Sequence, residues 1–325
     1  MIFGGIGIYT FLPRKISVRN TFKLATMWNI YSMAATDERN FRSLYYEKVG
    51  FRNVEEKKSL EILLKDKPLD RGKLKQFCLR FSVPATYRNL VWKILLGVIP
   101  VHVDCHEFIM DQREQEYNDL LRALNVMRII DQNTPKTQVF LAMWLLQTDN
   151  LTYDLNLSAE HGFLPIVQSF MQFFDNSSDV YWMAKKFYDN VRKFQADVPI
   201  LVERTHILLE KEDSAYYKSL VRNGILDNLP LNKWFDCCFA GILNDSALAK
   251  IWDKICGGSN KILVYVAVIL VTNLKHRLLK CTNNKDLQQC VKNITEETAE
   301  VIVNKSIELW QQFNSPLTIH DKPKP

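Results

Sequence analysis

Apolar residues recur every three or four positions along most of this chain, which is the spacing of one face of an α-helix. The clearest stripe lies in residues 117–130 and contains Tyr117, Leu120, Leu121, Leu124, Met127 and Ile130. The same period predicts further helices at 57–65, 88–96, 164–174, 180–194, 198–209, 233–243, 246–256, 285–292 and 295–313. The pattern therefore predicts an all-α fold without a substantial sheet.

The segment between Lys261 and Lys275 is apolar almost throughout and rich in β-branched residues. It is too long for a typical strand and too short to span a bilayer. We therefore expect a helix that is buried on all sides.

A polar island interrupts the pattern in the stretch "MRIIDQNTPKTQ" (127–138). Its members Asp131, Gln132, Asn133 and Thr134 end at Pro135 and lie between two apolar runs with helical spacing. Such an island is either a loop that holds catalytic groups or a simple turn. A second helix-poor stretch, residues 151–163, is the best candidate for a mobile loop.

Composition agrees with a helical protein that folds in water. Hydrophobic residues make up 47% and charged residues 24%, while glycine and proline number only 11 each. Four of the six net positive charges lie in residues 1–36, which leaves a nearly neutral body. A neutral body with mixed signs is a poor match to a nucleic-acid-binding surface. The seven cysteines are odd in number and include no CxxC, which indicates reduced thiols in the cytoplasm.

The first 32 residues contain basic and hydroxyl side chains and no acid. These features are typical of a mitochondrial transit peptide, and also of an upstream extension ahead of a true start at Met33. We expect an extension over 1–36, a folded helical domain over 37–313 and a flexible tail over 314–325. No segment is long enough to span a membrane.

Several segments resemble chemical sites without completing one. His102 and His106 flank Asp104 and Cys105, but no other His/Cys cluster could complete a structural zinc site. The glycine pair in "ICGGSNK" (255–261) lacks the spacing of a phosphate-binding loop and is expected to be a helix-end turn. The adjacent cysteines at 237–238 are expected to be buried thiols. We therefore expect no metal, no cofactor and no self-sufficient active site.

Three segments together resemble the TBC-domain family of Rab GTPase-activating proteins. "YRNLVWKILLGV" (87–98) is similar to the opening R-x-x-V-W-K-x-L-L-G motif, and "YWMAKKF" (181–187) to a helix midway along that domain. The block at 234–270, which contains "IWDKICGGSNKILVYVAVIL", is similar to the W…F…I-W-D…G…L-x-V-A-x-x-L block. The resemblance implies an all-helical fold.

Active members of that family insert an Arg from an I-x-x-D-x-x-R-T-x-P motif and a Gln from a downstream Y-x-Q-G motif beside the GTP phosphates. The resemblance places Asn133 or Thr134 at the Arg position, depending on the count, and neither is cationic. The stretch "LSAEHGFLPIVQSF" (157–170) stands where Y-x-Q-G is expected; Gln147 lies too far upstream and Gln168 falls inside the next helix. A non-catalytic domain is therefore expected. The rival readings are an active Rab GTPase-activating protein with a displaced Arg such as Arg128, and a generic helical adaptor.

Residues 39–66 and the "IWDKICGGSNKILVYVAV" block resemble one branch of the family more closely. In known relatives that branch supplies the small third subunit of the tuberous sclerosis complex, bound to hamartin. Tuberin in that assembly activates GTP hydrolysis by Rheb and so restrains mTOR signalling. The resemblance implies a cytoplasmic interaction subunit whose partners are a hamartin-like coiled coil and, through the complex, tuberin; small GTPases are a further class of partner.

A coiled-coil partner would use an apolar groove between surface helices, with anchors at i, i+3, i+4 and i+7. The N-terminal helices are the preferred place for such a groove because they carry many apolar residues close together. The candidate partner-binding residues are Phe41, Leu44, Tyr45, Leu60, Leu63 and Leu64. The alternative for each of them is a place in the domain's own core.

Overall fold

A computed structural model describes residues 52–152, 156–157, 160–281 and 284–320 of the chain. The chain divides into two compact units, Met1–Glu56 and Lys57–Pro325. The helices from Lys57 onwards belong to the second unit. The expected extension over 1–36 lies outside the described residues.

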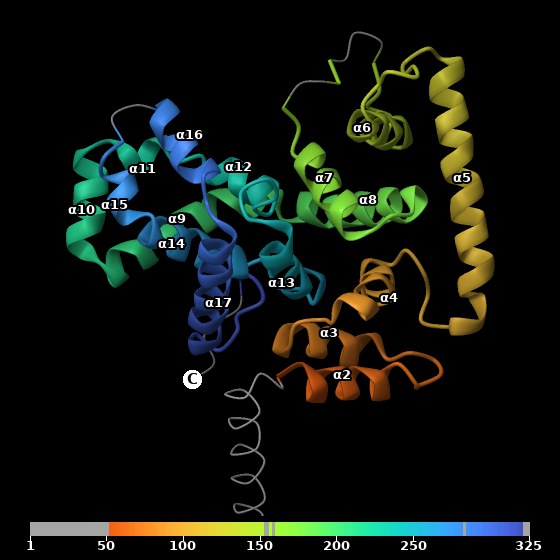
Figure 1. Cartoon of the computed structure of the whole chain (residues 1–325), viewed down its shortest axis with the longest axis horizontal. Helices are drawn as coiled ribbons and strands as arrows, with labels where there is room; N and C mark the ends of the chain where they lie inside the picture. Colours follow the sequence, from red (N-terminus) through yellow and green to blue (C-terminus); the bar gives the residue numbers. More distant parts are fainter. Residues whose placement is uncertain (1–51, 153–155, 158–159, 282–283, 321–325) are drawn as a thin grey trace, which may run out of the picture. The chain divides into compact units, whose positions relative to one another are not determined.

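All regular structure in the described part of the chain is helical, which confirms the all-α prediction (Figure 1). The α-helices are α2 (Arg52–Leu63), α3 (Arg71–Arg80), α4 (Ala85–Leu96), α5 (His106–Val126), α6 (Lys136–Gln147), α7 (Phe163–Phe173), α8 (Ser177–Lys193), α9 (Val198–Glu212), α10 (Ser214–Arg222), α11 (Ile225–Asn228), α12 (Leu231–Asp236), α13 (Asp245–Cys256), α14 (Ile262–Asn273), α15 (Lys275–Leu278), α16 (Asn284–Lys292) and α17 (Glu296–Gln312). Two short 3-10 helices, η1 (Val103–Cys105) and η2 (Gln195–Asp197), precede α5 and α9.

The apolar run after Lys261 forms α14, and it is buried on nearly every side as predicted. Its residues from Ile262 to Val268, together with Leu270 and Val271, are at most 2% exposed. The helix packs against both α9 and α17 (Figure 1). Because neighbours cover it all round, the segment needs no polar face, and this explains the missing helical period.

The first and last segments of the family-like pattern meet at one buried carboxylate. Asp253 on α13 is completely buried and accepts hydrogen bonds from the indole Nε1 of Trp92 and the backbone N–H of Val83, each at 2.9 Å. Arg88 on α4 donates to both carboxylate oxygens at 3.3 Å. Four donated hydrogen bonds and one cation thus offset part of the loss of water around this carboxylate, and burial still raises the pKa of Asp253. These motif residues hold α13 against α4.

Helix α3 was not predicted, because most of its residues are polar. Its side chains Leu74, Phe77 and Cys78 are nevertheless buried, and Asp70 caps its N-terminus by accepting from the backbone N–H of Lys73 at 3.0 Å. At its other end, Lys254 of α13 donates to the carbonyl of Cys78 at 2.7 Å and to that of Phe81 at 2.8 Å. A lysine therefore satisfies carbonyls that the helix end leaves open.

The predicted helix over 233–243 is shorter in the structure. Helix α12 ends at Asp236, and turns follow because Cys238, Phe239 and Gly241 have φ values of 48°, 62° and 72°. Non-glycine residues rarely adopt this left-handed conformation, so the sequence carried no mark of the break. Cys237 and Cys238 are buried, as predicted.

The first part of the expected flexible tail makes hydrogen bonds to the rest of the domain. The carbonyl of Pro316 accepts from the hydroxyl of Ser259 at 3.0 Å and from the indole N–H of Trp310 at 2.9 Å. The backbone N–H of Lys261 donates to the carbonyl of Leu317, and Ile319 is only 9% exposed. Residues 314–320 are therefore held against the start of α14 and the end of α17. Residues 321–325 lie outside the described residues.

No helix in the described ranges is long and apolar enough to cross a membrane.

Candidate functional site

The polar island between α5 and α6 is a turn closed by its own side chains. The carboxylate of Asp131 accepts from the backbone N–H of Asn133 at 3.0 Å and from the hydroxyl of Thr134 at 2.8 Å. In return, the Thr134 oxygen accepts from the backbone N–H of Asp131 at 2.9 Å. These hydrogen bonds, first from the Thr134 hydroxyl and then from Asn133, lower the pKa of Asp131. The polar groups that define the island are thus used to shape it.

Arg128, just before the island, ends α5. Its φ is 59°. Its backbone N–H donates to the backbone carbonyl of Asn125 at 3.0 Å, and the backbone N–H of Ile129 donates to that of Leu124 at 3.0 Å. This pair of bonds is the Schellman arrangement, in which the left-handed position is usually glycine. The Arg128 side chain is exposed. The left-handed backbone of Arg128 ends the helix. Helix α5 therefore stops at Val126, although the apolar stripe in the sequence continues to Ile130.

The loop before α7 folds one imidazole ring inward. His161 lies with ring centroids 5.5 Å from Trp144 on α6 and 5.6 Å from Tyr188 on α8. Its Nδ1 accepts the backbone N–H of Phe163 at 3.2 Å, which requires that nitrogen to be unprotonated. Burial, and then the nearby guanidinium of Arg192, lower the pKa of His161. The ring is therefore neutral at pH 7 and faces the aromatic cluster.

The residues beside His161 fix this loop in place. Gly162 lies close to α12 and α8, since a Cβ there would be in van der Waals contact with the backbone carbonyl of Asp236 at 3.4 Å and the ring of Tyr188 at 3.6 Å. On the other side, Glu160 pairs with Lys233 on α12 at 2.5 Å. Both side chains of this ion pair are exposed, so its contribution to stability is small.

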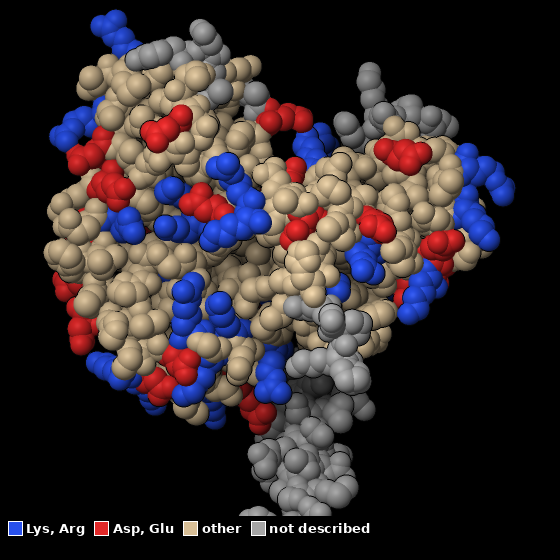
Figure 2. Space-filling view, turned by 180° about the vertical axis from the view of Figure 1, so that it is seen from behind, with Lys and Arg blue, Asp and Glu red and all other residues tan. Residues whose placement is uncertain are grey.

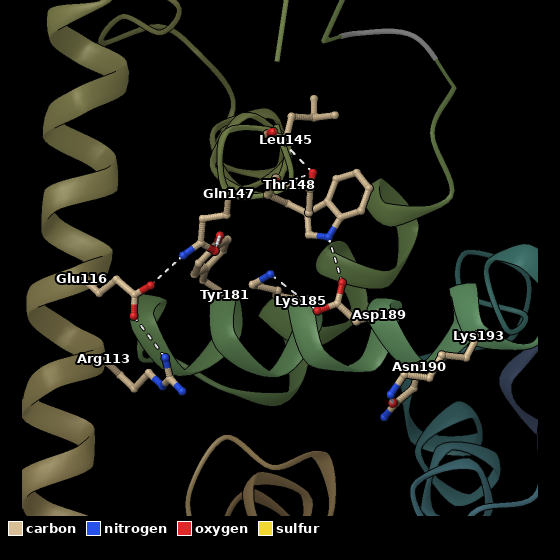
Figure 3. A network of polar contacts seen from close by, with 11 residues as sticks. Arg113, Glu116, Leu145, Gln147, Thr148, Tyr181, Lys185, Asp189, Asn190 and Lys193 are labelled. Carbon is tan, nitrogen blue, oxygen red and sulfur yellow. Dashed lines mark hydrogen bonds and ion pairs between the residues drawn. The ribbon is translucent and has the colours of Figure 1, made fainter. Parts of the chain in front are cut away.

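Helix α6 ends in a polar network that ties it to α5 and α8 (Figure 3). The amide nitrogen of Gln147 donates to Glu116 at 2.8 Å, and its amide oxygen accepts from the Tyr181 hydroxyl at 2.5 Å. Glu116 also pairs with Arg113 at 3.1 Å. Both polar atoms of the Gln147 side chain therefore make hydrogen bonds, and these fix the side chain between α5, α6 and α8.

The candidate partner-binding residues differ in their surroundings. Leu60 is completely buried in the core, and Leu63 and Leu64 are half-buried and packed against it. Leu60 is therefore a core residue and not an exposed anchor. Phe41, Leu44 and Tyr45 lie outside the described residues. On α2, the large apolar side chain that faces solvent is Ile62, which is 64% exposed.

The remaining polar motifs do not assemble a metal site in the described ranges, where no group of three or more His, Cys, Asp or Glu could hold an ion. The His106 ring lies 2.8 Å from the carbonyl of Pro100, and His102 is exposed. All seven cysteines are free thiols. Burial raises the pKa of Cys237 to about 12, which makes this thiol a poor nucleophile.

Charge is mixed on the face in Figure 2, where Lys and Arg alternate with Asp and Glu across uncharged surface. This distribution agrees with the small net charge of the body.

The chain has relatives among known proteins. The family model of the Rab-GTPase-TBC domain matches residues 85–279, and the chain belongs to that family. Among curated proteins, it is 41% identical over 284 residues to TBC1 domain family member 7 of Xenopus tropicalis, and 39% identical over 284 residues to the Homo sapiens protein of the same name. Each match covers 86% of this chain and 97% of the relative. These relatives bear out the resemblance found in the sequence.

A solved structure shows the same fold at low identity. The Ypt/Rab-GAP domain of Gyp1p aligns with a TM-score of 0.59 and 16% identity, over 80% of this chain and 99% of that one. This likeness shows the fold, in which segments 87–98 and 234–270 of this chain meet at Asp253. Sequence reasoning did not single out His161, although its place directly before Gly162 and α7 was a usable signal.

Proposed function

We propose that this TBC-domain protein works as an interaction subunit that does not itself catalyse GTP hydrolysis. It binds and stabilises a hamartin-like coiled coil in an assembly with a tuberin-like protein, and so supports inactivation of Rheb and restraint of mTOR signalling. This role belongs in the cytoplasm, where seven free thiols stay reduced. The observation that carries the non-catalytic part is the self-closed turn at Asp131–Thr134, which contains no cation.

An arginine finger stabilises charge that develops on the transferred phosphoryl group. It contributes roughly 10³ to 10⁵ in rate, which corresponds to about 4 to 7 kcal/mol. Asn133 and Thr134 have no charge, and a neutral amide cannot replace the planar guanidinium fork. Thr134 also uses its hydroxyl in two hydrogen bonds within the turn. The position that should bring a cation to the phosphates therefore brings none.

The second loop supports the same proposal. Counting back from Gly162 at the start of α7 puts His161 in the place of the motif's Gln. A Gln finger must reach out of the domain to the nucleotide, but the His161 ring is half-buried between Trp144 and Tyr188. Gln147 cannot replace it while Glu116 and Tyr181 hold its amide.

The rival function is Rab GTPase activation by a displaced arginine. The observation in its favour is that Arg128 is exposed three residues before Asp131, on a fold shared with a Ypt/Rab-GAP domain. Against it stands the left-handed backbone of Arg128, which is fixed by the end of α5. Both fingers would need replacement for this rival to hold.

The coiled-coil partner comes from the similarity to TBC1 domain family member 7 together with the sequence resemblance. Binding of a hamartin-like coiled-coil fragment is measured by calorimetry, and circular dichroism controls for folding. We expect tight binding that Ile62→Asp weakens by about 2 kcal/mol or more, through lost burial and a desolvated charge. The matched control is Ile207→Asp on α9, where the isoleucine is 48% exposed.

No binding of the fragment by the folded protein contradicts the proposed function. Equal affinity of the wild type and both Ile→Asp variants leaves the function standing and places the groove away from α2.

A further inference from the structure

The C-terminal part of α8 carries an excess of basic residues. From Tyr181 to Lys193 the helix holds Lys185, Lys186, Arg192 and Lys193 against the single acid Asp189. Lys186 and Lys193 are seven residues apart, so they lie on the same side of the helix, separated by about 10 Å along its axis. Figure 3 shows Tyr181, Lys185, Asp189 and Lys193 in order along α8.

The acids near this side neutralise only part of the charge. Asp189 lies 3.5 Å from the amine of Lys185, and the amine of Lys193 donates to the neutral amide of Asn190 at 2.9 Å. The charge of Asp189 also acts on Lys186, but this carboxylate already pairs with Lys185. One acid therefore faces two lysine amines.

Arg113 of α5 brings a further cation to the same place. Its guanidinium stacks 4.5 Å over the ring of Trp182 on α8, and one terminal nitrogen pairs with Glu116. Its Nε is buried and has no acceptor among the described atoms. A buried donor of this kind needs an acceptor, and an anionic side chain that docks beside it would supply one.

The cations also affect one another. Burial, followed by the charges of Lys185 and Arg113, lowers the pKa of Lys186. Lys186 is half-buried, so this repulsion is less screened by water than it would be on an open surface. An anion placed between Lys186 and Arg113 would relieve it, and this favours binding of negative charge.

We propose that Arg113, Lys186 and Lys193, here called the α8 basic stripe, dock the acidic face of a partner helix. The inference rests on the proposed function, because the helix in question belongs to the coiled-coil partner. Heptad spacing places carboxylates seven residues apart on one face, about 10 Å along a helix, which matches the separation of Lys186 and Lys193. Nucleic acid is the poorer match because the body as a whole is nearly neutral.

The test compares charge reversals at matched lysines. The Lys186→Glu/Lys193→Glu double variant should bind a hamartin-like coiled-coil fragment about tenfold or more weakly than wild type. The same variant should also lose most of the change in affinity between about 50 and 300 mM NaCl. The control is Lys218→Glu/Lys305→Glu, which reverses two exposed lysines on α10 and α17 and should bind as wild type does. Circular dichroism and melting temperature monitor folding in all variants.

The outcomes separate this inference from the proposed function. Equal affinity and equal salt dependence in both double variants overturn the α8 basic stripe and leave the function standing. If the fragment does not bind at all, the function fails, and the stripe is tested with a helical peptide of about 20 residues that carries Glu every seventh position. That peptide should bind at low salt more tightly than its Gln analogue, and only when Lys186 and Lys193 are intact. Equal binding of the two peptides overturns the inference.

Discussion

Truncation of Asp253 to alanine should destabilise the domain severely. The carboxylate is fully buried and accepts four hydrogen bonds, from Trp92, from Val83 and twice from Arg88. Removing it leaves the guanidinium of Arg88, whose side chain is 14% exposed, without its counter-charge. Breaking a buried ion pair costs about 3–5 kcal/mol, and each stranded donor costs about 1–3 kcal/mol unless water reaches it. We expect a loss of about 4 kcal/mol, a large fraction of a typical domain's stability of about 5–15 kcal/mol.

Urea unfolding followed by circular dichroism measures this loss. Asp111→Ala on α5 is the control, because that aspartate is exposed and its removal should change the free energy of unfolding by less than about 0.5 kcal/mol. Asp253→Asn should fall between the two, since it keeps the shape but removes the charge and one acceptor. A loss below about 1 kcal/mol in Asp253→Ala would refute the claim that this carboxylate joins α13 to α4.

Three further variants test local features of the two loops and the network. Arg128→Gly should raise the free energy of unfolding by about 1 kcal/mol, because glycine adopts the left-handed end of α5 without strain; a lower stability contradicts this. Gln147→Ala should cost about 1–3 kcal/mol by leaving the buried Tyr181 hydroxyl without a partner and Glu116 with Arg113 alone, and unchanged urea unfolding would show that the network is dispensable. The pKa of His161 is lowered by burial, so its contribution to stability is complete above its ordinary pKa of 6.5 and is lost as pH falls through the lower folded value; His161→Gln should therefore lose less stability than wild type between about pH 7.5 and 5, and an equal loss would contradict the buried ring.

Long helices with regular apolar spacing could be predicted from sequence. The predicted ranges for α8, α9, α13 and α14 agree with the structure within a few residues, because each buries one face or all faces against the core. Helix α3 could not be predicted in this way, since its polar residues hide a narrow buried side. The early end of α12 depends on left-handed turns at Cys238 and Phe239, and non-glycine residues give no local signal of such turns.

Part of the candidate site could likewise be predicted from the sequence, and part could not. Residues 131–135 combine Asp, Asn, Thr and Pro, so a turn could be predicted there from the known hydrogen-bonding habits of these side chains. The inward orientation of His161 depends on Trp144 and Tyr188, which come from two other helices. Contacts of that kind are set by tertiary packing and do not appear in a local pattern. The closeness of Arg113 on α5 to Lys186 on α8 could not be predicted from the sequence for the same reason.

The central claim is that this TBC domain binds without catalysing, and single-turnover GTP hydrolysis tests it most directly. Purified protein is added to a panel of GTP-loaded Rab proteins, and the wild type is compared with Arg128→Ala. We predict no appreciable acceleration by either, because Asn133 and Thr134 bring no cation to the phosphates. Acceleration of about a hundredfold or more by the wild type, lost in Arg128→Ala, would contradict the account and identify Arg128 as the displaced finger.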